Sequence, residues 1–177
     1  MLASPQYIPG WLPVLVALRY YMGHMNTNKT CTISSASSEE TEQIGEQIGR
    51  QLKGGEIIEL VSDLGGGKTT FVRGLAKGFG SSDTVASPTF TVSKEYIAGS
   101  KRVAHYDFYR LHDAGLLQFE LAESVSDPDT VVVVEWGDIV RDVLPDTRMT
   151  IHITATDSDS RSLKLTIPGE YNYIHVS

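Results

Sequence analysis

Hydrophobic and polar positions change their period along the chain, and each period predicts a different element. Polar and β-favouring residues alternate over 30–34, which indicates a short strand. Apolar residues then recur every fourth position from 44 to 52, which predicts one apolar face of a helix. Ser37 and Glu40 have the spacing of a capping box at the start of that helix, and two glycines follow its end.

A strand, a glycine-rich loop and a helix are predicted in direct succession. The strand is E-I-I-E-L-V (56–61), and the loop S-D-L-G-G-G-K (62–68) follows it at once. Beyond the loop, apolar residues share one helical face until Gly80 ends the helix. This succession is typical of a phosphate-binding loop.

The second half of the chain mixes strand and helix patterns. A hairpin is expected around a Gly99-Ser100 turn, and the run T-V-V-V-V-E-W (130–136) indicates a central strand covered on both faces. The other predicted elements are a short helix at 116–122, a helix at 137–144 that ends at Pro145, and strands at 149–156 and 162–168. We therefore predict an α/β protein.

Length and charge narrow the classes of function. A chain of 177 residues suits one domain, which we place at 26–170 with a C-terminal tail at 171–177. The formal net charge of −7 argues against a protein that grips nucleic acid unaided, since such proteins need a basic face. Cys31 is the single cysteine, so an intrachain disulfide is excluded.

Residues 1–25 are set apart as a leader of doubtful status. Its apolar core, W-L-P-V-L-V-A-L, is too short to span a bilayer, and a basic region typical of signal peptides does not precede it. Met22 and Met25 are alternative start positions. We expect no membrane association and a cytoplasmic location.

The loop at 62–68 has the residues that phosphate binding requires. Glycines at 65 and 67 leave backbone N–H groups open to phosphate oxygens, Lys68 would reach the β- and γ-phosphates, and the Thr69 hydroxyl would bind Mg²⁺. Ser62 stands where the usual pattern has its first glycine, so the alternative is a glycine-rich turn before a helix. The intact Gly67-Lys68-Thr69 favours the nucleotide site.

Two acidic residues are candidates for the chemistry. Glu135 ends the V-V-V-V run, where an acid of a parallel sheet faces the loop's Mg²⁺, although an exposed strand-end acid is the plain alternative. Asp107 in H-Y-D-F-Y-R could orient the attacking water, or it could simply pair with Arg110. In the nearby S-P-T-F, Ser87 or Thr89 could sense the γ-phosphate as a switch-like loop.

Five motifs in order resemble one family. They are D-L-G-G-G-K-T-T-F-V-R-G-L, S-P-T-F-T, Y-D-F-Y-R-L, V-E-W and L-P-D, and the resemblance covers about residues 30 to 168. Together they are similar to TsaE (YjeE), the bacterial ATPase subunit of the tRNA threonylcarbamoyladenosine machinery. The resemblance implies a P-loop NTPase-like, mixed, mainly parallel sheet with flanking helices and antiparallel hairpin additions. It also implies ATP hydrolysis with Mg²⁺.

The same resemblance implies partners and site residues. The partners would be the catalytic subunit of the tRNA threonylcarbamoyltransferase and its dimerising partner, which would hold the tRNA and modify adenosine 37 of tRNAs that read ANN codons. The catalytic residues would be Lys68, Asp107 and Glu135, and the metal ligands Thr69 and Glu135. The implied nucleotide-binding residues are Ser38, Asp63, Leu64, Gly65, Gly66, Gly67, Lys68, Thr69, Thr70, Trp136, Asp138 and Arg161.

Some of these positions have plain alternatives, and three residues depart from the family pattern. Ser38, Asp138 and Arg161 could instead be a helix cap, a helix-start acid and a surface arginine. The departures are Ser62 for glycine, Gly66 for alanine and Gly137 for proline. Of these, Ser62 is expected to affect nucleotide affinity and Gly66 to add flexibility only.

Other functions remain open at the sequence level. A small-molecule kinase with the same loop would need an acceptor pocket and a helical lid, whereas residues 84–110 predict a hairpin. A GTPase would need a base-reading N-K-x-D or T-K-x-D motif after Glu135, which the sequence lacks. A scaffold that binds nucleotide without hydrolysing it is the third alternative.

Overall fold

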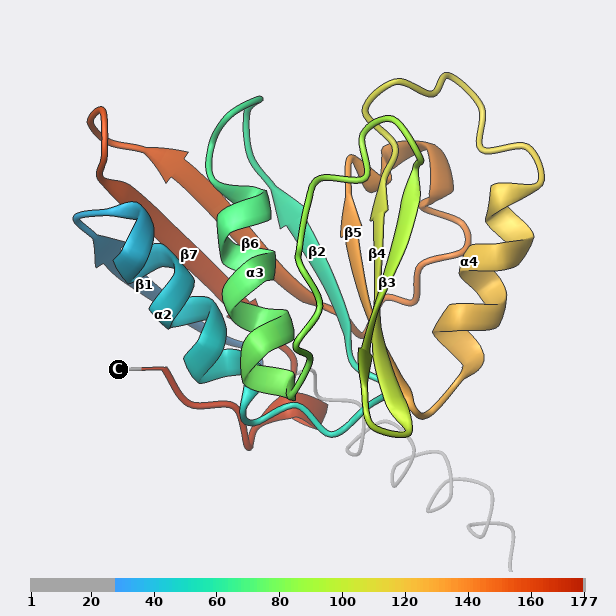
Figure 1. Ribbon diagram of the computed structural model, residues 1–177, viewed down its shortest axis with the longest axis horizontal. Coiled ribbons are helices and arrows are strands. Elements are labelled where there is room, and N and C mark those ends of the chain that lie inside the picture. Colours follow the sequence, from blue (N-terminus) through green and yellow to red (C-terminus); the bar gives the residue numbers. More distant parts are fainter. Residues whose placement is uncertain (1–27, 177) are drawn as a thin grey trace, which may run out of the picture.

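The computed structural model describes residues 28–176, so the leader predicted at 1–25 lies outside the described residues. Within that range a seven-stranded sheet has the order β1-β7-β6-β2-β5-β4-β3. Helices α2 and α3 lie side by side over one face of the sheet, and α4 packs against the opposite face at β5 (Figure 1). No helix among the described residues is long and apolar enough to cross a membrane.

The elements follow the predicted succession closely. The strands are β1 (Lys29–Ser35), β2 (Ile57–Val61), β3 (Ser93–Ala98), β4 (Lys101–Asp107), β5 (Thr130–Glu135), β6 (Met149–Ala155) and β7 (Arg161–Ile167). The helices are α2 (Ser38–Gly49), α3 (Lys68–Phe79) and α4 (Leu117–Ser126), with short 3-10 turns η1 (Gly137–Val140) and η2 (Gly169–Tyr171).

The centre of the sheet is parallel and its edges are antiparallel. β2 pairs in parallel with both β5 and β6, and β4 pairs in parallel with β5. β3 returns on β4 as a hairpin, and at the other edge β7 pairs antiparallel with both β6 and β1. The predicted fold class is therefore confirmed, including its antiparallel additions.

The central position of β5 follows from its composition. All six residues of the strand are buried. Val131 and Val133 belong to the core beneath α2 and α3, while Val132 and Val134 belong to the core beneath α4. A run of four valines presents apolar side chains on both faces of the strand and is stable only when both faces are covered, which is why it predicts the middle of a parallel sheet.

The backbones of helices α2 and α3 come into direct contact, because each helix has glycines on the face that meets the other. A Cβ added at Gly74 would lie 1.8 Å from the carbonyl oxygen of Glu42, and one at Gly45 would lie 2.3 Å from that of Phe71. Gly49 and Gly78 are equally close to the opposite backbone. This packing fixes the first turn of α2 beside the first turn of α3, where the glycine-rich loop ends.

Two predicted elements differ in the structure. The stretch before Ser93 was expected to be strand, but the carbonyl of Pro88 accepts bonds from the backbone of Thr91 and Val92 and closes a turn. The helix expected at 137–144 is a 3-10 turn over Gly137–Val140 followed by further turns. So short a segment before Pro145 gains too few hydrogen bonds to offset the cost of starting an α-helix.

The last described residues pack against the sheet. Tyr171 and Ile174 are buried in the core beneath α2 and α3. The Tyr171 hydroxyl accepts a hydrogen bond from the backbone N–H of Ile57 at 3.1 Å. The segment that follows β7 therefore supports the start of β2, the strand that leads into the loop.

Candidate functional site

The loop between β2 and α3 turns through two glycines with positive φ. Gly65 has φ 77° and Gly67, the residue that caps α3, has φ 108°. The first helical bond runs from Phe71 N–H to the Gly67 carbonyl at 3.0 Å. Earlier N–H groups of a helix have no partner within it, and they form its positive end. The loop therefore has the donors that an anion at this point would use.

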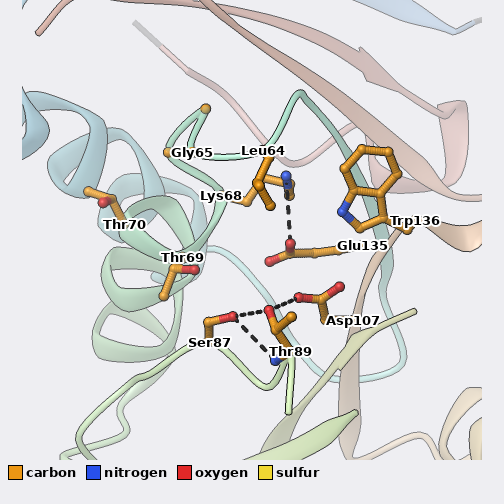
Figure 2. A pocket seen from close by; sticks show the side chains of 12 residues that line it. Leu64, Gly65, Lys68, Thr69, Thr70, Ser87, Thr89, Asp107, Glu135 and Trp136 are labelled. Carbon is orange, nitrogen blue, oxygen red and sulfur yellow. Dashed lines mark hydrogen bonds and ion pairs between the residues drawn. The ribbon is translucent and has the colours of Figure 1, made fainter. Parts of the chain in front are cut away.

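A pocket of about 270 Å³ opens at this end of the sheet. Figure 2 shows Lys68, Asp107, Glu135 and Trp136 around a common space, while Thr70 points away toward α2. The structure thus brings together residues from the loop, from the ends of β4 and β5, and from the turn before β3. The lining residues are Leu64, Gly65, Gly66, Gly67, Lys68, Thr69, Thr70, Ser87, Thr89, Asp107, Glu135 and Trp136.

Lys68 lies at the floor of this pocket and is almost fully buried. Its Nζ donates to the carbonyl oxygens of Ser62 and Asp63 at 3.2 and 3.1 Å. The same Nζ lies 3.8 Å from Oε2 of Glu135, whose side chain is also buried. A buried ammonium and a buried carboxylate are tolerated when they face one another, and each would be costly alone. The charged head thus stays at the pocket.

Asp107 is held by a short chain of hydroxyl groups. Thr89 Oγ1 donates to Asp107 Oδ2, and the Tyr109 N–H donates to Oδ1 at 3.0 Å. Because a hydroxyl has one hydrogen, Ser87 Oγ is the donor in its 2.6 Å bond to Thr89. The hydroxyl chain therefore runs Ser87 to Thr89 to Asp107 (Figure 2). The alternative pairing with Arg110 does not form among the described residues, since that guanidinium stacks on Phe90.

Glu135 and Trp136 end β5 with a sharp change of direction. Trp136 has φ 58°, a left-handed conformation that costs a non-glycine residue energy and is common at functional sites. This turn places the indole ring 5.1 Å from Lys68 Nζ and 5.1 Å from the ring of Tyr109. Trp136 therefore forms one wall of the pocket, beside the lysine.

His105 is a functional candidate that the sequence analysis missed. It is completely buried, and its Nε2 lies 2.9 Å from Oε1 of Glu135. The sequence spacing already placed His105 on the same face as Asp107, because residues two apart on a strand share a face. Only the pairing of β4 with β5 shows that this face meets Glu135.

A second, smaller pocket of about 160 Å³ adjoins the loop from the side of α2. It brings together Ser38 and Arg161, two of the implied nucleotide contacts, with Thr41, Gly65, Gly67, Thr70 and Asp159. The helix cap is Ser37, whose Oγ accepts from the Glu40 N–H at 3.2 Å, so Ser38 does not serve as the cap. Arg161 Nε donates to the Gly66 carbonyl at 3.0 Å and so braces the loop.

Two of the implied residues lie outside both pockets. Asp63 contributes its carbonyl to Lys68, and its remaining atoms line a different hollow beside β6. Asp138 lines another hollow, on the far side of Trp136, and pairs with Arg141 at 2.5 Å. The Asp138 side chain is 80% exposed, which matches the plain alternative of an acid at the start of a helical turn.

Ser62 and Gly66, two of the three departures from the family pattern, lie against each other. A Cβ at position 66 would lie 1.8 Å from Ser62 Oγ and 3.2 Å from Ser62 Cβ. The serine hydroxyl donates to the Asp63 carbonyl at 3.2 Å. Ser62 fills the volume that an alanine side chain at position 66 would need. Limited space therefore explains the glycine at this position, in addition to the flexibility that it gives the loop.

The donors at the pocket suit a magnesium ion that nucleotide phosphates also hold. Mg²⁺ prefers oxygen ligands and keeps several waters, so one carboxylate and one hydroxyl suffice beside phosphate oxygens. Glu135 and Thr69 supply these oxygens at one pocket. Within residues 28–176 there is no cluster of three or more His, Cys, Asp or Glu side chains that could hold a metal ion. A metal ion at this pocket would therefore need ligands from the nucleotide and from water as well.

Comparisons with known proteins show that the chain is similar to proteins of one family. The model of the family described as threonylcarbamoyl adenosine biosynthesis protein TsaE matches residues 35–163. A Bacillus subtilis protein named tRNA threonylcarbamoyladenosine biosynthesis protein TsaE is 35% identical over 139 residues, which cover 76% of this chain and 84% of that protein. A Nostoc protein of the same name is 34% identical over 80% of this chain and 89% of its own. The crystal structure of Bacillus subtilis YdiB has a TM-score of 0.68 at 32% identity, with 84% of this chain and 93% of that chain covered.

Proposed function

The chain belongs to the TsaE family, and from this premise we propose that it is the Mg²⁺-dependent ATPase subunit of the machinery that forms threonylcarbamoyladenosine in tRNA. A role in the formation of this modified nucleoside follows from the names of its relatives. Hydrolysis of ATP, the metal and the partner subunits are the proposed part. The observation that supports them best is the convergence of the Leu64–Thr70 loop, Asp107 and Glu135 on one pocket.

The loop and Arg161 would bind the nucleotide. The open N–H groups at the start of α3 would receive phosphate oxygens, and Lys68 could exchange its two carbonyl acceptors for them. The adjoining pocket at Ser38 and Arg161 would receive the remainder of the nucleotide. A guanidinium suits ribose and phosphate oxygens because it is a rigid, permanently charged donor.

Thr69 and Glu135 would hold Mg²⁺, which when bound neutralises charge that develops on the phosphates. Asp107 would orient the attacking water, since one end of its carboxylate faces the pocket that the loop lines. The hydroxyl chain from Ser87 would report the γ-phosphate, because a phosphate oxygen that accepted the Thr89 hydroxyl hydrogen would free Asp107 Oδ2. Such a change of hydrogen-bond partner would be the switch-like behaviour expected of the S-P-T-F segment.

The partners would be the catalytic subunit of the tRNA threonylcarbamoyltransferase and its dimerising partner. With a net charge of −7 this chain is poorly suited to hold tRNA by itself, so tRNA would be reached through those subunits. We place this assembly in the cytoplasm. Hydrolysis by the isolated chain would be slow, because partner contacts are needed to complete the site.

Two of the alternatives, the kinase and the scaffold, make different demands on the pocket. For a small-molecule kinase, a helical lid would be expected over the phosphates, and the structure has the β3–β4 hairpin between α3 and α4. A scaffold that does not hydrolyse nucleotide would need the loop but neither Asp107 nor Glu135. The two carboxylates at the pocket therefore favour hydrolysis over a scaffold.

The test is ATP hydrolysis with and without the two partner subunits, read beside the level of the modified nucleoside in tRNA. We expect slow hydrolysis alone, stimulation by the partners, and loss of both readouts in Lys68→Ala and Glu135→Ala with the fold preserved by circular dichroism. Modified tRNA at normal levels in cells that carry either variant would refute the proposal. Binding of ATP with normal modification in Asp107→Asn would favour the scaffold.

A further inference from the structure

His105 is a fully buried polar residue whose role the pocket does not directly explain. It lies on β4 behind the carboxylate of Glu135, and its Nε2 is 2.9 Å from Oε1. The ring centroid of Tyr96 lies 6.3 Å from that of the His105 ring. Among the described residues its other ring nitrogen, Nδ1, has no hydrogen-bond partner.

The unpartnered nitrogen indicates which tautomer the ring has. A buried N–H donor without an acceptor costs free energy, and an unprotonated ring nitrogen without a donor costs less. The hydrogen is therefore best placed on Nε2, where Glu135 Oε1 accepts it. An apolar side chain would fill the same core position without leaving Nδ1 unsatisfied, so packing does not account for histidine here.

The bond also makes the two oxygens of Glu135 different. Oε1 contacts His105 Nε2, whereas Oε2 lies 3.8 Å from Lys68 Nζ. The sheet register fixes this contact, because Asp107 stands beside Glu135 and His105 stands one step behind, beside Val133. A carboxylate held through one oxygen cannot rotate freely at the other.

We propose that His105 is a positioning residue, which holds Oε1 of Glu135 so that Oε2 is presented to the metal and Lys68. The inference rests on the proposed function of Glu135 as a metal ligand. Groups that orient a metal ligand from behind commonly change metal affinity by about 10- to 100-fold when they are removed. His105 itself does not line the pocket and needs no contact with nucleotide.

The experiment measures how much Mg²⁺ each variant needs, with Trp136 as the reporter. The chain has two tryptophans, so Trp11→Phe in every protein leaves Trp136 as the single source of tryptophan emission beside Lys68. Emission is followed while MgCl₂ is added at saturating ADP, and ADP binding is measured separately in EDTA. The variants are His105→Leu, His105→Gln, which keeps a donor at the place of Nε2, and Tyr106→Phe.

Tyr106→Phe is the matched control, because it removes a buried hydrogen bond from the neighbouring position of β4. That hydroxyl bonds Ser124 Oγ at 2.8 Å, on the opposite face of the sheet from Glu135. His105→Leu should raise the Mg²⁺ concentration at half-maximal change by about 10-fold. His105→Gln should recover most of that loss, and the control should match the parent protein. ADP binding in EDTA should be the same in all four proteins.

The outcomes separate this inference from the proposed function. If the parent needs Mg²⁺ but His105→Leu needs no more of it, or if Tyr106→Phe shifts the midpoint equally, the positioning role is overturned and the metal site stands. If Gln behaves as Leu does, the donor at Nε2 is not the cause and the inference also fails. If the parent shows no response to Mg²⁺ at all, the metal assignment of Glu135 falls and this role with it.

Discussion

Replacing Gly66 by alanine should damage the wild-type loop and should be tolerated once Ser62 is replaced by glycine. The Cβ of the new alanine would lie 1.8 Å from Ser62 Oγ, so the serine must rotate and give up its hydrogen bond to the Asp63 carbonyl. Rotation does not remove the contact of 3.2 Å with Ser62 Cβ. In the Ser62→Gly chain both contacts disappear, and the Asp63 carbonyl at 3.1 Å remains.

The magnitude follows from these contacts. A lost hydrogen bond costs about 1 kcal/mol, and overpacking adds a part of its usual ~1–3 kcal/mol. We therefore expect Gly66→Ala to lower the free energy of unfolding by about 2 kcal/mol in the wild-type chain. In the Ser62→Gly background the loss should be below about 0.5 kcal/mol, because alanine also restricts the unfolded chain. The coupling energy is then about 1.5–2 kcal/mol.

Four proteins form the cycle: wild type, each single variant and the double variant. Urea denaturation gives the free energy of unfolding, and calorimetric titration with ADP gives the affinity, in which about 1.4 kcal/mol corresponds to tenfold. The double variant should be as stable as Ser62→Gly and should bind ADP more tightly than Gly66→Ala. Effects that add within about 0.5 kcal/mol would refute the reasoning, since independent sites behave in that way.

Three further predictions use other parts of the structure. Gly74→Ala should destabilise the protein by about 3 kcal/mol in urea denaturation, because the new Cβ would lie 1.8 Å from the α2 backbone. The better helix propensity of alanine is too small to offset this clash. An unchanged denaturation midpoint would contradict the close packing of α2 and α3. Arg161→Ala should weaken ADP binding about tenfold in calorimetric titration, because the Arg161 Nε–H that donates to the Gly66 carbonyl is lost. The thermal stability of the protein should be unchanged. Equal ADP affinity in the variant and the wild type would show that Arg161 does not support the loop for binding. Burial, and then the nearby Glu56 carboxylate, raise the pKa of the Tyr173 phenol above its ordinary value of 10.0. The unfolded chain therefore ionises first, so stability should fall as pH rises above about 10, and Tyr173→Phe should flatten that fall in urea titrations at pH 8 and pH 10.5.

Local pattern was enough to predict most elements but not their neighbours. The capping box, the apolar stripe of α2, the loop before α3 and the run of β5 each depend on residues close in sequence, and each is present where expected. The pairing of β1 with β7 and of β6 with β2 joins segments far apart along the chain. A period of two shows which face of a strand is apolar, but it contains no information on which strand lies beside it.

The candidate site divides in the same way. The loop residues and Glu135 were found because their motif is continuous or ends a recognisable strand. His105 was missed because its contact with Glu135 runs between strands. Thr41 of α2 and Asp159 of the turn between β6 and β7 were missed because only the fold brings these elements to the same small pocket. The coupling of Ser62 with Gly66 was also hidden, since each departure alone looks neutral and only the turn of the loop brings them together.

The register between β4 and β5 is what assembles the acidic half of the site. Asp107 stands directly beside Glu135, and His105 lies on the same face one step earlier. A slip of one residue would turn both β4 side chains to the opposite face, toward α4, and leave Glu135 with neither neighbour. Such a slip would also bring Tyr106 from the α4 core to the loop side. Burial of both faces of these strands therefore fixes the register, and the same apolar packing that stabilises the sheet places the carboxylates of the site.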